Sequence, residues 1–298
     1  MQTLPTGLRY FHEVATTGSI TEAAESQHVS PSAISRQISQ LERQIGAPIF
    51  RRHARGMELT DEGVLLLAHT RRAQADGEQL MQELNGISAR TSRVIEVVSS
   101  EGLALSLTPR AIAEFSKIHP EISIRLRVLP SNEAALQVIE GNADLATVFA
   151  LGPQRDAVVE YACPAPAYAV VSTDHPLAGS PKLSLDELCQ FPLSMPDKGI
   201  TQRELFDIAT ATAGLSPRIA LISNHINPVL EYARSGAGVT LLSRFARRYG
   251  ISHDLDFIPI DNPVLAERTA QILTMPRRRQ PALVTAFIQQ VIEVMKEY

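Results

Sequence analysis

The chain has 298 residues, of which 44% are apolar, and it carries a formal net charge of −4 at pH 7. This length exceeds that of one ordinary domain and suits a small domain followed by a larger one. No basic start leads into an apolar run, and no apolar stretch reaches the roughly 18 residues of a membrane span. We therefore expect a cytoplasmic protein with no signal peptide and no membrane partner.

Residues 11–52 predict a DNA-binding helix-turn-helix. Ser19 can cap a first helix, and Glu22 stands three residues later, as a capping box requires. Ser30 can cap a second helix, which has Pro31 at its first position, where the missing N–H costs nothing. The segment between the two, residues 27–29, is just long enough for the tight turn that sets two helices at a steep angle.

The second predicted helix has one face suited to a protein core and one suited to DNA. Apolar side chains recur at helical spacing on the first face, namely Ile34, Ile38, Leu41 and Ile45. The opposite face carries short polar side chains and one long donor: Ser32, Ser35, Arg36 and Ser39. Arg36 can bond a guanine edge through two hydrogen bonds or clamp a phosphate. A merely solvated serine-rich face is the alternative interpretation.

The acidic net charge conceals a basic patch near the N-terminus. Residues 1–60 hold six arginines and five glutamates, a net of +1, so the remaining 238 residues carry −5. DNA affinity must therefore come from a local patch rather than from global charge. Such a patch is formed by Arg51, Arg52, His53 and Arg55. A cluster of this kind usually positions phosphate and reads no sequence, and a solvated turn is the alternative.

After Thr60 the sequence predicts one long helix, from Asp61 to about residue 90, which would span on the order of 45 Å. Apolar residues recur every seven positions along it, at Leu66, Ala73, Leu80 and Ile87, with Leu84 four after Leu80. That spacing is typical of a seam between two helices, so we expect a homodimer that reads two half-sites. Packing of the stripe on the protein's own C-terminal part is the alternative.

From residue 93 onwards, strand and helix patterns alternate. Residues 94–98 read as a strand, 108–115 as a helix, 122–128 as a half-buried strand, 132–140 as a helix and 141–149 as a turn and strand. The alternation continues through residues 168–172, 201–213, 218–222, 228–235, 239–243 and 255–260, and it ends with a strand at 269–275 and a helix at 282–297. This order predicts α/β sheets with helices on both faces.

An ordered string of motifs resembles the LysR-type transcriptional regulators. It comprises LRYF at 8–11, GSI at 18–20, AA at 23–24, VSPSAISRQI at 29–38, LE at 41–42, GAPIFRR at 46–52 and LTDEG at 59–63. The resemblance implies an all-α winged helix-turn-helix whose wing is formed by residues 48–60, and it implies a homodimer or homotetramer that binds double-stranded DNA. Its implied DNA-binding residues are Ser30, Pro31, Ser32, Ser35, Arg36, Gln37, Arg51, Arg52 and Arg55.

The C-terminal part also resembles this family, through the looser motifs GNADLA at 141–146, DHPL at 174–177 and SGAGVTLL at 235–242. The resemblance implies an α/β, periplasmic-binding-protein-like domain of two lobes, with a small-molecule effector in the cleft between them. The expected division is a DNA-binding domain at 1–60, a linker helix at 61–92 and a regulatory domain at 93–298. Within the last, lobe I spans about 93–162 and 267–298, and lobe II about 163–266.

Effector-binding positions are expected beyond the carboxyl ends of strands and at helix starts, where free N–H groups favour anions. The candidates are Ser99, Ser100, Glu101, Asn132, Phe149, Thr201, Gln202 and Asn224. Any of the polar ones could instead be a simple helix cap. Glu101 has a further consequence, because a carboxylate facing the effector would repel an anion and favour a neutral or cationic ligand. If Glu101 points outward, nothing follows.

No catalytic or metal-binding constellation is recognisable, so we expect neither an enzyme nor a cofactor. The eight histidines are scattered and fall in no known catalytic motif. Cys163 and Cys189 belong to no metal-binding cluster, and two buried thiols are a commoner arrangement than a redox-sensing disulfide. A ligand-independent DNA-binding regulator and a small-molecule-binding module that does not bind DNA remain the alternatives.

Overall fold

The computed structural model describes residues 4–53, 56–84, 93–152, 154, 156–247, 254–276, 278 and 280–298. The chain divides into two compact units, the first made mainly of residues 1–91 and the second mainly of residues 92–298. Each unit is considered by itself. Among the described residues, none of the helices is long and apolar enough to cross a membrane.

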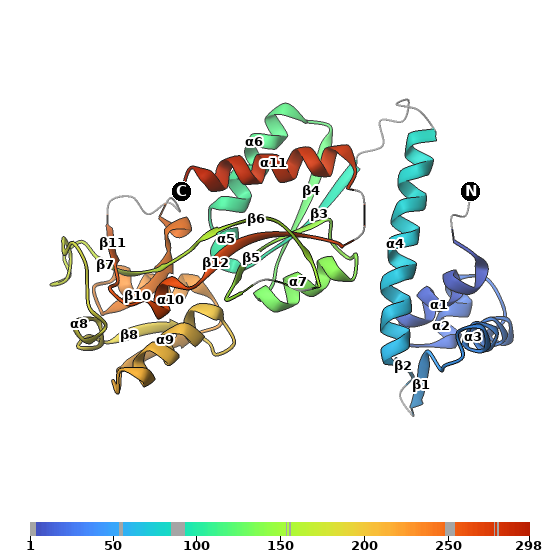
Figure 1. Ribbon diagram of the computed structural model, residues 1–298, viewed down its shortest axis with the longest axis horizontal. Coiled ribbons are helices and arrows are strands. Elements are labelled where there is room, and N and C mark those ends of the chain that lie inside the picture. Colours follow the sequence, from blue (N-terminus) through green and yellow to red (C-terminus); the bar gives the residue numbers. More distant parts are fainter. Residues whose placement is uncertain are drawn as a thin grey trace. The chain divides into compact units, whose positions relative to one another are not determined.

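The N-terminal unit is a winged helix-turn-helix followed by a long helix (Figure 1). Its elements are α1 (Thr6–Thr17), α2 (Ile20–Ser26), α3 (Pro31–Ile45), β1 (Phe50–His53), β2 (Gly56–Leu59) and α4 (Asp61–Leu84). The expected cap of α3 is confirmed, because the Ser30 hydroxyl accepts a hydrogen bond from Ala33 N at 3.3 Å and Pro31 is the first helical residue. The expected capping box of α2 is incomplete. Ser19 Oγ accepts from Glu22 N, but Ser19 N donates to Thr17 Oγ1 instead of to Glu22.

The core of this unit is formed where α1, α2 and α3 meet the start of the wing. It contains Phe11, Val14, Ala23, Ala24, Ile34, Ile38 and Ile49, all nearly or fully buried. Two predictions about apolar residues were wrong. Ile45 is 41% exposed, because it is the last residue of α3 and lies beyond the other helices. Leu66 packs against this core and not along a seam; the side chains of Leu80 and Leu84, and Ile87, lie outside the described residues.

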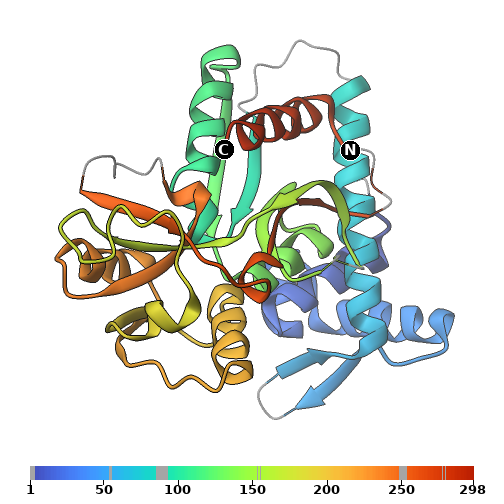
Figure 2. The ribbon, with the colours of Figure 1, turned by 60° about the vertical axis from the view of Figure 1, so that its left-hand side comes forward.

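The wing is an antiparallel hairpin of β1 and β2 that is fastened to the turn between α1 and α2. In Figure 2 the two strands project beyond the helices. Met57 N donates to Gly18 O at 2.8 Å. At the same place Gly56 has φ of 135°, and a Cβ there would lie 2.6 Å from Gly18 O. The close approach of the two backbones therefore requires glycine at position 56.

Side chains also fix the junction between the wing and α4. The Thr60 hydroxyl donates to Pro48 O at 2.7 Å and accepts from Gly63 N at 3.0 Å, so it closes the hairpin and caps α4. Glu42 reaches from α3 to accept a hydrogen bond from Ile49 N at 3.1 Å. These contacts determine where the wing begins relative to α3.

The C-terminal unit contains two five-stranded sheets, one for each lobe. The sheet of lobe I has the order β4-β3-β5-β12-β6, made of β3 (Arg93–Ser99), β4 (Ile122–Val128), β5 (Leu145–Ala150), β6 (Val158–Pro164) and β12 (Thr269–Thr274). Strands β3, β4 and β5 are parallel, and β12 runs antiparallel to both β5 and β6. Helices α6 (Leu107–Ile118) and α11 (Ala282–Lys296) cover one face and α7 (Ser131–Ile139) the other, as Figure 1 shows.

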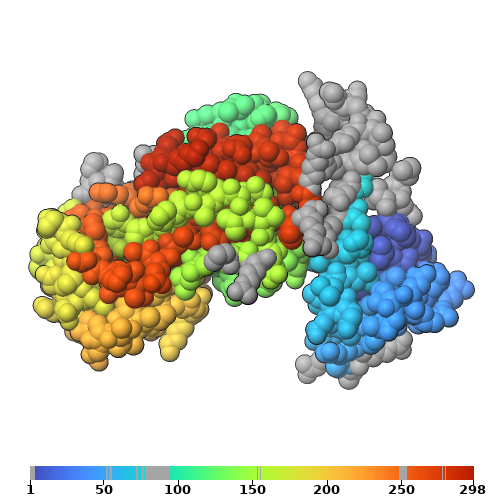
Figure 3. Space-filling model, in the orientation of Figure 1, coloured from blue at the N-terminus to red at the C-terminus, as the bar shows by residue number. Residues whose placement is uncertain are grey.

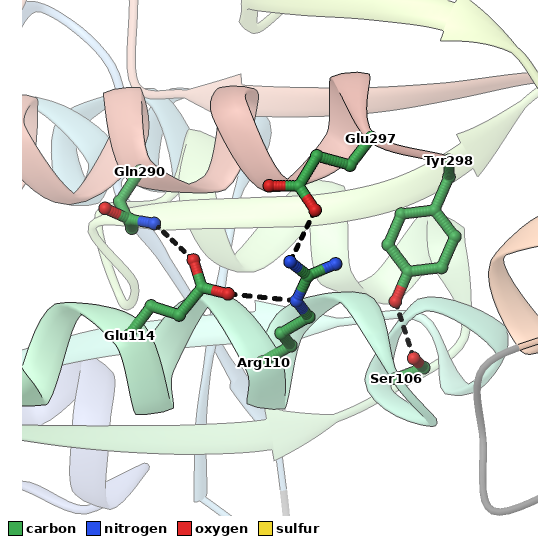
Figure 4. A network of polar contacts seen from close by, with 6 residues as sticks. All are labelled: Ser106, Arg110, Glu114, Gln290, Glu297 and Tyr298. Carbon is green, nitrogen blue, oxygen red and sulfur yellow. Dashed lines mark hydrogen bonds and ion pairs between the residues drawn. The ribbon is translucent and has the colours of Figure 1, made fainter.

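The last helix, α11, is held on α6 by a row of polar contacts above the buried core (Figure 4). Glu114 accepts from Arg110 Nε at 2.9 Å and from Gln290 Nε2 at 2.8 Å. Arg110 also pairs with Glu297, and Ser106 bonds the Tyr298 hydroxyl. Figure 3 shows α11, in red, lying along the green segments of lobe I. The C-terminus is thus an integral part of this lobe.

Lobe II has the sheet order β11-β7-β10-β8-β9, made of β7 (Ala167–Ser172), β8 (Leu193–Pro196), β9 (Ile219–Ser223), β10 (Val239–Ser243) and β11 (Leu255–Pro259). Helices α8 (Leu185–Cys189) and α9 (Thr201–Thr212) pack on one face, and α10 (Ile226–Arg234) on the other. Two short 3-10 turns, η1 (Arg244–Ala246) and η2 (Val264–Ala266), complete it. The chain passes between the lobes twice, from β6 to β7 and from β11 to β12.

The alternation of strands and helices predicted for this unit is confirmed, with element ends that differ by one or two residues, or by three at the end of α6. Four elements were not predicted: β6, α8, β8 and α5 (Glu101–Ala104). Each has a weak pattern. The helices α5 and α8 have four and five residues, and β8 has four. The side chains of β6 are mostly exposed, which removes the apolar alternation.

Candidate DNA-binding and effector-binding sites

The start of α3 is an exposed polar surface. Ser30, Ser32 and Arg36 are exposed, and Ser35 and Gln37 are half-buried. The hydroxyls of Ser30 and Ser32 lie 2.9 Å apart, so the cap of the helix and its first polar side chain form one hydrogen-bonded pair. Because Ile34 and Ile38 are buried on the opposite side, the helix is fixed with Arg36 directed outward.

The wing presents a second positive group beside this helix. Arg51 is exposed in β1, and the backbone of Arg52 pairs with Met57. The side chain of Arg52, and Arg55 as a whole, lie outside the described residues. An exposed ion pair joins His53 Nε2 and Glu58 at 3.0 Å. Glu58 also stands opposite Arg51 in the hairpin register, so the wing carries both signs of charge.

Of the expected effector-binding residues, Ser99 is engaged within lobe I. It is fully buried, and its hydroxyl lies 2.7 Å from Thr147 Oγ1 and 3.2 Å from Thr108 Oγ1. The two threonines are themselves 2.9 Å apart. This closed group of three hydroxyls ties β3 to β5 and to α6, which accounts for the polar residue at the end of a buried strand.

Ser100 and Phe149 lie at the edge of lobe I that faces lobe II. Ser100 is 5% exposed, and its hydroxyl has no hydrogen-bond partner among the described residues. Two residues later, Gly102 packs on the Phe149 ring, because a Cβ at Gly102 would come within 2.9 Å of that ring. Phe149 N is bonded to Ser131 Oγ at 3.3 Å, which fixes the end of β5 to the start of α7.

Arg268 links this group to lobe II. The guanidinium lies 4.1 Å from the centroid of the Phe149 ring. Its Nη1 donates to Gln202 Oε1 at 3.0 Å, and its Nε donates to Ala165 O at 3.2 Å. Arg268 is only 2% exposed, and burial lowers its pKa to about 9, so it stays protonated near neutral pH. Burial of a cation among neutral groups costs several kcal/mol of hydration.

Glu101 forms a second link between the lobes. Its carboxylate accepts a hydrogen bond from Ile226 N, the first residue of α10, at 3.0 Å, and it lies 3.6 Å from His225 Nδ1. An anion at a helix start is stabilised by the free N–H groups and by the helix dipole. The carboxylate is therefore directed at α10, and the repulsion of an anionic effector considered from the sequence has this local compensation.

The remaining candidates are not part of this group. Asn132 and Asn224 are exposed, and none of the described contacts connects them with Arg268. Thr201 is half-buried and is the first residue of α9, directly before Gln202. The structure thus brings together Ser100, Phe149 and Gln202. It adds Arg268, which sequence reasoning missed because an arginine beside Glu267 and before a strand has the pattern of an exposed loop.

The two cysteines are not paired with each other. Cys163 is buried in β6 and Cys189 is half-buried at the end of α8, and both are free thiols. Burial raises the pKa of both thiols, which keeps them protonated and weakly nucleophilic. Among the described residues no group of His, Cys, Asp and Glu side chains could hold a metal ion.

Comparison with known proteins gives two family matches that together cover most of the chain. Residues 5–64 match the bacterial regulatory helix-turn-helix protein, lysR family, and residues 88–296 match the LysR substrate binding domain. The transcriptional regulator CysB of Burkholderia cenocepacia is 28% identical over 93% of this chain and 87% of its own length. The RuBisCO operon transcriptional regulator of Allochromatium vinosum is 30% identical over 79% of this chain and 78% of its own.

Solved structures share the fold. Full-length OxyR from Pseudomonas aeruginosa has a TM-score of 0.71 at 17% identity and covers 98% of this chain and 94% of its own. CbnR complexed with its target DNA has a TM-score of 0.54 at 20% identity and covers 97% and 98%. The chain therefore belongs to the LysR family: it is a homo-oligomeric transcription regulator that binds double-stranded DNA and responds to a small-molecule effector bound by its C-terminal domain.

Proposed function

We propose that the start of α3 reads base edges in the major groove through Ser32, Ser35 and Arg36, while Ser30, Pro31 and Gln37 contact the flanking backbone. The observation that carries this proposal is the exposure of Arg36 and Ser32 on a helix whose other face is fully buried. Short serines allow the helix to approach the bases closely, and the single arginine supplies a bidentate donor. Arg51, Arg52 and Arg55 hold the wing on phosphate.

We further propose that the effector binds at the junction of the two lobes, against Ser100, Phe149, Thr201 and Gln202. The chain then works as a DNA-binding domain at 1–60, a linker at 61–92 and a regulatory domain at 93–298. It acts in the cytoplasm, where its DNA is, and without catalytic chemistry of its own. Effector binding changes the relation between paired DNA-binding domains, with a coupling of about 1–3 kcal/mol.

The DNA-binding part is tested with the full-length protein and a DNA fragment enriched by that protein from a random pool. Arg36→Ala is expected to cost roughly 1–3 kcal/mol of binding free energy and to relax specificity at one position of each half-site. Arg51→Ala is the matched control, because it removes the same charge from the wing. It should weaken binding to all sequences alike and reduce the salt dependence. Equal weakening on all sequences by Arg36→Ala would contradict its base-reading role.

A further inference from the structure

Arg268 is a buried positive charge whose described partners are all neutral. They are the carbonyl oxygen of Ala165, the amide oxygen of Gln202 and the face of Phe149. In the described part of the chain its Nη2 has no hydrogen-bond partner, although it is inaccessible to solvent. A buried cation normally has a carboxylate beside it, because the loss of hydration is otherwise uncompensated. Arg268 is thus a charge that lacks its counter-charge.

Two more polar groups of the same region are buried without partners among the described residues: Gln202 Nε2 and Ser100 Oγ. Gln202 is the residue bonded to Arg268, and Ser100 precedes the Gly102 backbone that packs on the Phe149 ring. An amide NH₂ and a guanidinium NH₂ can only donate, and a hydroxyl can donate. The missing partner must therefore be an acceptor of several hydrogen bonds.

The start of α9 points to the same chemistry. This helix has 12 residues, and its N-cap position, Ile200, supplies no side-chain hydrogen bond to the first turn. Thr201 and Gln202 open the helix, so the positive end of its dipole lies where Gln202 meets Arg268. A formal positive charge and a partial one converge there.

Glu101 does not serve as the missing counter-charge. Its carboxylate accepts from Ile226 N at 3.0 Å and lies beside His225, so its charge is compensated at the start of α10. The acidic residue nearest in the sequence to this group is therefore already engaged elsewhere.

We propose that the effector is a small oxyanion ligand, a carboxylate or an inorganic oxyanion, that pairs with Arg268 and accepts hydrogen bonds from Gln202 and Ser100. This inference rests on the proposed effector site at the junction of the lobes. Arg268 immediately precedes β12 of lobe I, and Gln202 opens a helix of lobe II. An anion bound to both therefore bridges the lobes, which gives the ligand a direct means of fixing their relative position.

The test is thermal unfolding of the full-length protein at constant ionic strength in potassium chloride. Sodium sulfate, acetate and benzoate are titrated below about 10 mM, where the general stabilising effect of sulfate is small. Benzyl alcohol and benzylamine serve as the neutral and cationic probes. We expect a saturable rise in Tm with at least one anion and none with the other two probes. Sulfate and the carboxylates distinguish the two sources of the oxyanion.

The decisive variant is Arg268→Met, which keeps the length of the side chain and removes its charge. The half-saturating anion concentration should rise on the order of thirtyfold or more. Arg125→Met is the matched control, since Arg125 is 65% exposed and loses the same charge on the surface of β4. It should leave the titration unchanged. Without ligand, Arg268→Met should keep or raise Tm, whereas a purely structural arginine predicts a fall.

Other results would contradict the proposal in distinguishable ways. No saturable response to any of the anions overturns it, as does anion binding by Arg268→Met with wild-type affinity. A response to benzyl alcohol or benzylamine alone overturns the anion assignment but leaves the lobe junction as the site. An anion response that survives both Arg268→Met and Gln202→Leu places the ligand elsewhere and overturns the proposed site as well. If Arg268→Met does not fold, Gln202→Leu and Arg268→Lys carry the test, and both should weaken the anion response.

Discussion

His175 shows how a single buried side chain makes stability depend on pH. Its Nδ1 accepts a hydrogen bond from Leu177 N at 3.2 Å, and its ring lies 4.8 Å from that of Phe191. An acceptor nitrogen must be unprotonated, and burial lowers the pKa of His175 below the ordinary value of 6.5. The unfolded chain therefore takes up the proton first as the pH falls.

We expect His175 to reduce the free energy of unfolding as the pH decreases through 6.5 towards 5, and to have no effect above about 7.5. His175→Asn keeps an acceptor oxygen and cannot be protonated, so its stability should fall less over this range. Denaturant titrations of both proteins at pH 7.5, 6.5 and 5.5 measure the difference. Parallel curves for the two proteins would show that His175 is not the titrating group. His12, whose pKa burial and Arg71 also lower, contributes equally to both.

At the scale of elements, the junction of the wing and α4 depends on Gly63. A Cβ at this position would lie 2.2 Å from Ile49 O, so Gly63→Ala must push the wing away from α4. We expect a loss of about 1–3 kcal/mol from the N-terminal unit, as in other overpacked sites. Gly7→Ala is the control, because the nearest atom to its Cβ would be Gln37 Oε1 at 3.6 Å. It should leave stability unchanged or raise it by up to about 1 kcal/mol.

Hydrogen exchange of the α1–α3 amides measures this effect, since it reports the stability of the N-terminal unit apart from the rest of the chain. Faster exchange in Gly63→Ala and not in Gly7→Ala is the expected result. Equal exchange in the two variants would mean that the wing adapts to the methyl group without cost.

Elements with strong periodicity or strong caps could be predicted from the sequence. The α3 helix has both, since Ser30 and Pro31 mark its start and Ile34 and Ile38 mark its buried face. The 3.6-residue period could not show that the neighbouring helices end before Ile45. For the same reason, a seven-residue repeat assigned Leu66 to a partner helix although it packs on its own domain. Periodicity identifies an apolar face and not what covers it.

At the scale of the whole regulatory domain, Glu101 fastens lobe I to the first turn of α10 in lobe II. Glu101→Ala removes this cap and should cost about 1 kcal/mol, as the loss of a helix cap usually does. Glu101→Gln keeps an acceptor oxygen and should retain most of the contact. Hydrogen exchange at Ile226 and the next α10 residues is expected to be faster in Glu101→Ala. Unchanged exchange there would mean that the lobes are held by other contacts.

The effector-binding group is also a property of the whole domain, which limits how far the sequence could reveal it. The polar residues after β3 and at the start of α9 follow a local rule, and Ser100 and Gln202 were found by it. Arg268 lies outside any such rule, because its burial depends on β12 joining β5, which is 119 residues away in the pairing of Thr269 with Ala150. Long-range pairings of this kind bring together side chains whose local sequence gives no signal.

The position of β12 between β5 and β6 has a consequence for the order of events on the ribosome. Lobe I cannot complete its sheet until residue 274 is synthesised, nor cover it until α11 has followed. The N-terminal unit is finished some two hundred residues earlier and, since domains generally fold as units as they emerge, can fold first. A chain stopped anywhere between the two points has a reader of DNA but an incomplete receptor, so messages cut short in this stretch encode a regulator that is insensitive to its signal.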